Sequence, residues 1–192
     1  SRIRVMMISC AFLRGLLRRQ ALCAERSGKG YCCMNEGGRF LAYAIEQQRS
    51  AEETYDEEDV LRACHAAFEL AMCGEFALKA YLLLNSFEPP GTHKHEVLIR
   101  ECGRCGLKIP RYLRDVMDIL YEFESSTRYD ADYFVEDTEF KEACNALARF
   151  IDILLNTCAS GLIKKLRETL SADQTADISD ALLLQKYFIY LE

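Results

Sequence analysis

The sequence predicts an all-α fold, an antiparallel up-and-down helical bundle with additional helices at its N- and C-terminal ends. Apolar residues recur at intervals of three and four in several long segments, and no segment of five or more residues alternates strictly enough to predict a strand. Half of the 192 residues are hydrophobic and only three are proline. The chain is therefore long enough and apolar enough to bury a core of helices.

Residues 1–36 are predicted to form a basic N-terminal helical extension, with a helix over residues 3–24 that is apolar on most sides. Residues 1–49 carry nine Lys and Arg against three Asp and Glu, whereas the remainder carries fifteen against twenty-seven. This split indicates either a basic arm that seeks an acidic partner such as nucleic acid, or an arm that folds back on the acidic body.

Residues 37–160 are predicted to form the bundle itself, and its first helix is expected over residues 39–51. Phe40 and Ile45 lie on the face of this helix that is expected to be buried, and Gln48 lies on the face expected to be exposed.

The longest helical pattern covers residues 55–85, and we expect this helix to form the centre of the bundle. Thr54 and Glu57 have the spacing of a capping box, which predicts that the helix begins there. Gly74 is the only glycine in the pattern and allows another helix to approach closely. The apolar stripe predicted to be buried consists of Leu61, Cys64, Phe68, Ala71, Leu78 and Leu82.

Three further bundle helices are predicted over residues 92–102, 110–126 and 138–158. Thr92 is a candidate cap for the first of them, and Pro110 occupies the position that proline favours at the start of the second. The buried stripe of the last is predicted to be Ala143, Leu147, Phe150 and Leu154.

Residues 125–137 are predicted to form a polar and aromatic loop between the last two bundle helices. Residues 161–192 are predicted to form a C-terminal helical extension, with helices near 160–171 and 178–191. The last of these helices carries so much apolar surface that we expect it to dock on the bundle or to form a subunit contact, and we predict a homodimer.

The run from Glu58 to Leu155 resembles the HEPN family, the higher-eukaryote and prokaryote nucleotide-binding domain. Ala63 to Leu84 is similar to the long helix of that family, and Glu75, Lys79 and Ala80 match its motif. The order and the spacing of the predicted helices agree with the family as well.

Two shorter segments add to this resemblance. His95 and Leu98 look like the family's His before a short leucine-containing helix, and Thr127-Arg128-Tyr129 looks like its Thr-Arg-Tyr motif. The match departs from the family at Asp130, where many members have proline.

The resemblance implies that a nucleotide or RNA ligand would be bound by Lys79, His95, Arg128 and Tyr129. A guanidinium group can meet a phosphate, and a tyrosine ring can stack on a base. The residues themselves leave a second interpretation open. Lys79 has the spacing of an ion pair with Glu75, and Arg128 has acidic neighbours, Asp130 and Asp132, that could pair with it.

Ribonuclease members of the family carry an Arg and a His separated by four to six residues, and this motif is absent here. The three histidines are His65, His93 and His95, and none follows an Arg at that spacing. We therefore expect a domain without ribonuclease activity that binds a nucleotide or RNA, or that is the partner of a nucleotidyltransferase-type protein.

Two alternatives to this function remain open. The first is a divergent ribonuclease toxin of a toxin–antitoxin system, which would use Arg128 with His95. The second is a structural dimerisation module.

Cys102 and Cys105 have the spacing of half a zinc site, but no second pair with the required spacing accompanies them. We interpret them as the end of a helix and expect neither a metal nor a cofactor. The ten cysteines lie in apolar helical patterns, which favours reduced thiols, and the N-terminal apolar stretch is interrupted at Arg14. We therefore expect a cytoplasmic protein without a membrane span.

Overall fold

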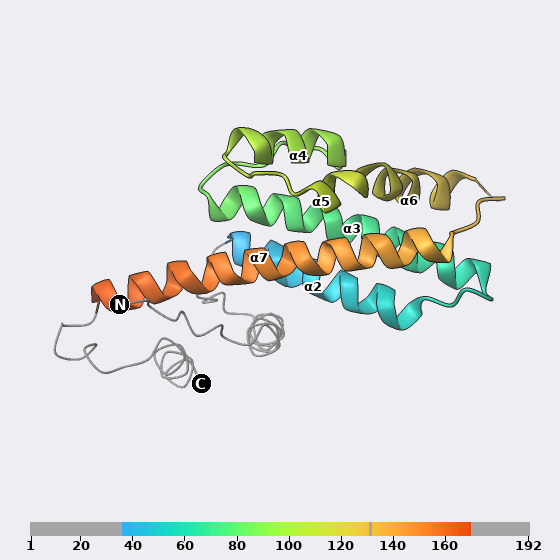
Figure 1. Cartoon of the computed structure of the whole chain (residues 1–192), viewed down its shortest axis with the longest axis horizontal. Coiled ribbons are helices and arrows are strands. Elements are labelled where there is room, and N and C mark those ends of the chain that lie inside the picture. Colours follow the sequence, from blue (N-terminus) through green and yellow to red (C-terminus); the bar gives the residue numbers. More distant parts are fainter. Residues whose placement is uncertain (1–35, 131, 170–192) are drawn as a thin grey trace.

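The computed structural model describes residues 36–130 and 132–169, and every element in these ranges is a helix (Figure 1). The fold is therefore all-α, as the sequence predicted. No helix in this part of the chain is long and apolar enough to cross a membrane. The helices are α2 (Glu36–Thr54), α3 (Val60–Leu84), α4 (His95–Arg104), α5 (Arg111–Asp115), α6 (Met117–Tyr129) and α7 (Asp137–Thr169).

Helix α3 is the centre of the bundle and packs against α2, α4, α6 and α7. Its buried side chains are mostly small, including Ala63, Ala66 and Ala67, so the neighbouring helices can lie close to it. Larger side chains from the other helices, such as Phe123 and Phe150, fill the core between them. The predicted role of this helix as the centre of the fold is confirmed.

The predicted start of α3 is wrong. Thr54 is the last residue of α2, and Asp59 caps α3 by accepting hydrogen bonds from the backbone N–H groups of Leu61 and Arg62 at 3.1 and 3.2 Å. A single carboxylate that satisfies two free N–H groups is a strong cap. Leu61, predicted to be buried, lies in this first turn and is 82% exposed.

Gln48 is buried rather than exposed because α7 packs against this side of α2. Its amide Nε2 donates to Glu52 Oε1 at 2.9 Å and lies 3.9 Å from Cys144 Sγ on α7. Periodicity alone does not indicate that two faces of α2 are covered, one by α3 and one by α7.

The helix predicted over residues 110–126 is interrupted at Val116, where α5 ends and α6 begins. Pro110 is the N-cap of α5. The second piece, α6, extends further than predicted, because Thr127, Arg128 and Tyr129 form its last turn rather than part of a loop.

Two other helices differ from the prediction at their ends. Helix α4 begins at His95 rather than near Thr92, whose Oγ1 accepts from the N–H of Lys94 at 3.2 Å. Helix α7 continues without a break to Thr169, so the predicted boundary of the bundle at residue 160 falls within it. The buried stripe predicted for α7 over residues 138–158 is confirmed. The helices predicted over 3–24 and 178–191 lie outside the described residues.

Candidate functional site

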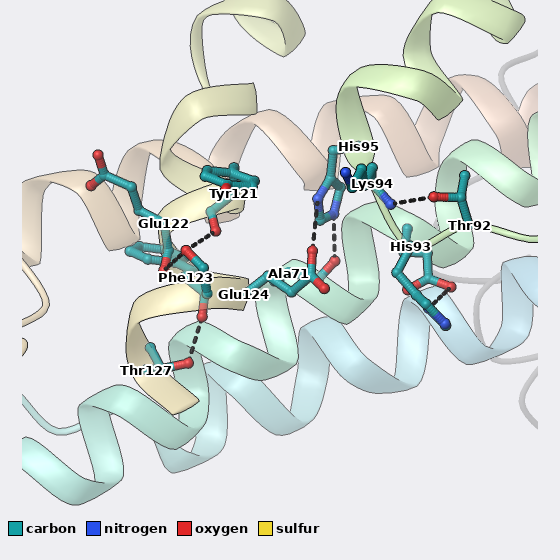
Figure 2. Close-up of polar contacts among 12 residues, drawn as sticks. Ala71, Thr92, His93, Lys94, His95, Tyr121, Glu122, Phe123, Glu124 and Thr127 are labelled. Atoms are coloured by element: carbon teal, nitrogen blue, oxygen red, sulfur yellow. Dashed lines mark hydrogen bonds and ion pairs between the residues drawn. The ribbon is translucent and has the colours of Figure 1, made fainter. Parts of the chain in front are cut away.

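The four predicted ligand residues lie along neighbouring helices. Lys79 is on the second half of α3, His95 begins α4, and Arg128 and Tyr129 end α6. Figure 2 draws the contacts of His95 with Ala71 and Glu124. The four predicted ligand residues do not form one cleft, because their contacts follow α3 from Phe68 to Lys79, a length of about 16 Å. We call this row of side chains the polar seam; it consists of Glu75, Lys79, His93, His95, Glu124 and Arg128.

His95 is the centre of the seam and is only 2% exposed. Its Nε2 lies 2.8 Å from the carbonyl oxygen of Ala71 on α3. Because a carbonyl oxygen can only accept, Nε2 must carry the proton of this hydrogen bond. Gly74 makes room for the imidazole: a Cβ on this residue would lie 3.2 Å from His95 Nε2 and 3.0 Å from Leu120 Cδ1 of α6. The predicted close approach at Gly74 is confirmed.

The second ring nitrogen of His95, Nδ1, is buried and has no hydrogen-bond partner among the described residues. It faces the carboxylate of Glu124, with 3.9 Å between Nδ1 and Oε2 (Figure 2). Burial lowers the pKa of His95, although the Ala71 carbonyl and the charges of Glu124 and Glu75 oppose this effect. His95 is therefore held neutral, with an unprotonated Nδ1 that points at a carboxylate.

Glu124 also binds Arg128, which connects the seam to the end of α6. The guanidinium Nη2 of Arg128 lies 3.0 Å from Glu124 Oε1, and its Nε donates to the backbone carbonyl of Glu124 at 2.9 Å. The same guanidinium lies 5.1 Å from the centre of the Phe68 ring and 5.5 Å from that of Tyr129. Arg128 thus pairs with Glu124 and not with either aspartate predicted as its partner, while Tyr129 is 82% exposed.

Lys79 is neutralised in a similar way at the other end of the seam. Its Nζ lies 2.7 Å from Glu75 Oε1, and the side chain of Glu75 is buried. His93 adds a second contact, with Nδ1 2.9 Å from Glu75 Oε2. The ion pair that the spacing of Glu75 and Lys79 indicated is present, and the contact of His93 with Glu75 ties the loop before α4 to α3.

The charges of the seam balance, because each of its two permanent cations is paired with a carboxylate. Around it, residues 39–158 carry 13 Lys and Arg against 23 Asp and Glu, a formal net charge of −10. An anionic ligand that approached Lys79 or Arg128 would meet the carboxylate of Glu75 or Glu124 beside the cation. The arrangement is suited to holding α3, α4 and α6 together.

Cys102 and Cys105 lie at the end of α4, as predicted. The Cys102 thiol is buried, lies 3.5 Å from the Leu78 carbonyl, and has its pKa raised to about 12 by burial. Gly106 follows with a positive φ of 96°, which a glycine adopts without strain. Within the described ranges, no three His, Cys, Asp or Glu side chains are grouped so as to hold a metal ion.

Sequence reasoning missed two carboxylate contacts of the seam. The pair of Glu124 with Arg128 has the spacing of four residues that stabilises helices, but the prediction of a loop after residue 125 obscured it. The contact of His93 with Glu75 joins residues 18 positions apart, and no local pattern indicates it.

Comparison with known proteins agrees with this architecture. The family model described as the HEPN domain matches residues 39–158, which include most of α2, all of α3 to α6 and two thirds of α7. No curated protein and no solved structure matches the chain. The match covers more than half of the chain and contains the whole polar seam, and the chain therefore belongs to the HEPN domain family.

Proposed function

We propose that this chain is a HEPN domain without ribonuclease activity that works as the partner of another protein, of the nucleotidyltransferase type. Membership of the family supports a function connected with nucleotides or RNA. The observation that carries the proposal is the charge balance of the polar seam. Lys79 and Arg128 already hold carboxylates, and the bundle around them is acidic. An RNA backbone is bound through cations that neutralise its phosphates, and an acidic surface disfavours such binding.

The geometry of His95 supports the absence of catalysis. A general acid or base must come within hydrogen-bond reach of the proton that it transfers. The Nε2 of His95 is occupied by the Ala71 carbonyl, and Nδ1 is buried beside Glu124. His95 therefore cannot serve with Arg128 as the catalytic pair of a divergent ribonuclease toxin without opening α4 away from α3.

The end of the bundle where α3 begins offers a surface for a protein partner. Leu61, Tyr129 and Phe134 are large apolar side chains that are more than half exposed. Helix α3 and the loop between α6 and α7 meet there, since Cys64 Sγ lies 3.8 Å from the Tyr133 carbonyl (Figure 1). Exposed aromatic and aliphatic side chains at one end of a domain are typical of contact sites between proteins.

Co-expression tests this proposal. The tagged chain and a nucleotidyltransferase-type protein from the same genome would be purified together, and the variants Leu61→Ser and Phe134→Ser compared with wild type. We expect wild type to retain its partner and both variants to lose most of it. Tyr121→Ser, at an equally exposed aromatic on α6, serves as the control. Failure of every such protein to co-purify with wild type would contradict the proposal.

We also propose that the chain forms a homodimer. The apolar composition of residues 178–191 supports it, because such a segment needs an apolar surface to cover it. Light scattering at micromolar concentration is expected to give twice the mass of one chain. A mass of 22 kDa would refute the dimer.

One observation favours direct binding of a nucleotide or RNA as a second candidate function. Arg128 is half-exposed beside the exposed ring of Tyr129, so a phosphate and a base could contact the two together. Labelled RNA would be titrated against wild type and Arg128→Ala at two salt concentrations. Binding that weakens in the variant, with the salt slope reduced by about one, would support this function. Equal affinity would exclude Arg128 as a ligand contact.

A further inference from the structure

An aromatic cluster lies on the outer surface of α2 and α3. Phe40 and Tyr43 of α2 and Phe76 of α3 form it, and we call it the aromatic patch. The ring centres of Phe40 and Tyr43 each lie 5.9 Å from that of Phe76, and 6.5 Å from one another. Phe40 and Phe76 are half-buried, while Tyr43 is 51% exposed.

The patch lies on the side of α2 that α7 does not cover. Two residues of α2 contact Cys144 of α7: Glu52 Oε1 lies 3.1 Å from the thiol, and Gln48 Nε2 lies 3.9 Å from it. Tyr43 and Glu52 are nine residues apart, two and a half helical turns, so they lie on opposite faces of α2. The patch is thus a surface formed by α2 and α3 together.

The same surface continues along the two antiparallel helices to Ser50 and Glu69. Ser50 Oγ donates to Glu69 Oε1 at 2.5 Å. Ser50 follows Tyr43 by seven residues and Glu69 precedes Phe76 by seven, so both pairs fit the same alignment of the two antiparallel helices. The other carboxylate oxygen of Glu69 is buried without a hydrogen-bond partner among the described residues. The surface therefore offers apolar rings near the start of α2 and an acidic group about 10 Å further on.

We propose that the aromatic patch is the docking surface for residues 3–24 of the same chain. The sequence predicts for this segment a helix that is apolar on most sides, which needs an apolar surface to cover it. Residues 1–24 carry five Arg and no Asp or Glu, whereas residues 39–158 have a net charge of −10. Apolar and electrostatic contacts would therefore both favour docking.

The chain connection favours this occupant over others. The described structure begins at Glu36, one turn before Phe40, so the segment is tethered beside the patch. Residues 25–35 span up to about 36 Å when extended, whereas the surface from Phe40 to Ser50 is about 15 Å long. A short tether gives the segment a high effective concentration at the patch.

Trypsin digestion of the full chain tests the proposal, because the segment contains its own cleavage sites at Arg14, Arg18 and Arg19. Wild type would be compared with Tyr43→Gln, and the cleaved sites identified by mass spectrometry. We expect cleavage at these sites to be about tenfold faster in Tyr43→Gln, because the segment loses the burial of one aromatic ring. Tyr43→Phe keeps the ring and should remain protected. Equal cleavage rates in wild type and Tyr43→Gln would overturn the proposal.

The controls distinguish residues 3–24 from two other possible occupants of the patch, the C-terminal segment and a second copy of the chain. Tyr121→Gln, at a tyrosine of similar exposure on α6, should leave cleavage at Arg14 unchanged. If Tyr43→Gln instead accelerates cleavage at Lys186, the C-terminal segment occupies the patch and the proposal is wrong. Protection that disappears on dilution would indicate a second copy of the chain and would overturn it as well. Tyr43 is exposed, so circular dichroism should show the bundle intact in the variant.

Discussion

Acidification should destabilise the bundle through one buried residue, His95. Its imidazole is neutral in the folded protein because burial lowers its pKa below the ordinary 6.5. In the unfolded chain the same imidazole takes up a proton as the pH falls below 6.5. The unfolded state then binds more protons than the folded state, so the free energy of unfolding decreases as the pH falls.

The magnitude follows from this linkage. If His95 stays neutral in the folded protein at pH 5.5, one pH unit below its unfolded pKa, the loss of stability is RT ln 11, or about 1.4 kcal/mol. The loss begins near pH 6.5 and continues until the folded pKa is reached. The groups that face His95 are Ala71 and Glu75 on α3 and Glu124 on α6, and all three reduce the size of the pKa shift.

Urea denaturation at pH 7.5 and 5.5 measures this loss. His95→Gln retains a side-chain N–H for the Ala71 carbonyl but does not titrate, so its stability should decrease by up to about 1.4 kcal/mol less than that of wild type. Carboxylates are present in both proteins, so their contributions to the pH dependence of stability cancel in the comparison. His65→Gln, at an exposed histidine outside the polar seam, serves as the control and should keep the loss seen in wild type. An identical loss in wild type and His95→Gln would refute the assignment of a buried neutral imidazole.

Three further substitutions test the packing around α3. Gly74→Ala should lower the free energy of unfolding by about 1–3 kcal/mol, although alanine favours helices. The reason is that the new Cβ would lie 3.0 Å from Leu120 Cδ1 and 3.2 Å from His95 Nε2. An unchanged or higher denaturation midpoint would contradict this prediction. Leu61→Ala should change stability by less than about 0.5 kcal/mol, whereas Leu70→Ala should cost about 2–5 kcal/mol. If thermal unfolding gave equal losses of stability for Leu61→Ala and Leu70→Ala, Leu61 would have to be covered.

Helical periodicity predicted the parts of the fold that depend on local pattern. The central helix, the buried stripe of α7 and the close approach at Gly74 are all present. These features follow from the spacing of apolar and small residues along one helix, which sequence records directly.

Helix ends were harder to predict, because several residues near a boundary compete to cap it. Thr54 with Glu57 has the pattern of a cap, yet Asp59 is the residue that satisfies the free N–H groups of α3. The choice between them depends on where α2 stops, and α2 extends to Thr54 because its packing on α3 and α7 continues to Ala51. Tertiary packing of this kind is not visible in a local pattern.

The polar seam was predicted in part. The pair of Glu75 with Lys79 follows from their spacing along one helix. Arg128 was assigned to a loop because its surroundings are polar, although the helix continues through it and turns it towards Glu124. The contact of His95 with the Ala71 carbonyl depends on the crossing of α4 over α3, which only the three-dimensional structure provides.

The most direct test of the account is the rate at which the purified chain cleaves RNA. Labelled single-stranded RNA would be incubated with wild type and with Arg128→Ala, and the products separated on a gel. Because His95 is buried and Arg128 is held by Glu124, we expect no cleavage above the buffer control with either protein. Cleavage by wild type that Arg128→Ala abolishes would contradict the claim that this HEPN domain lacks ribonuclease activity.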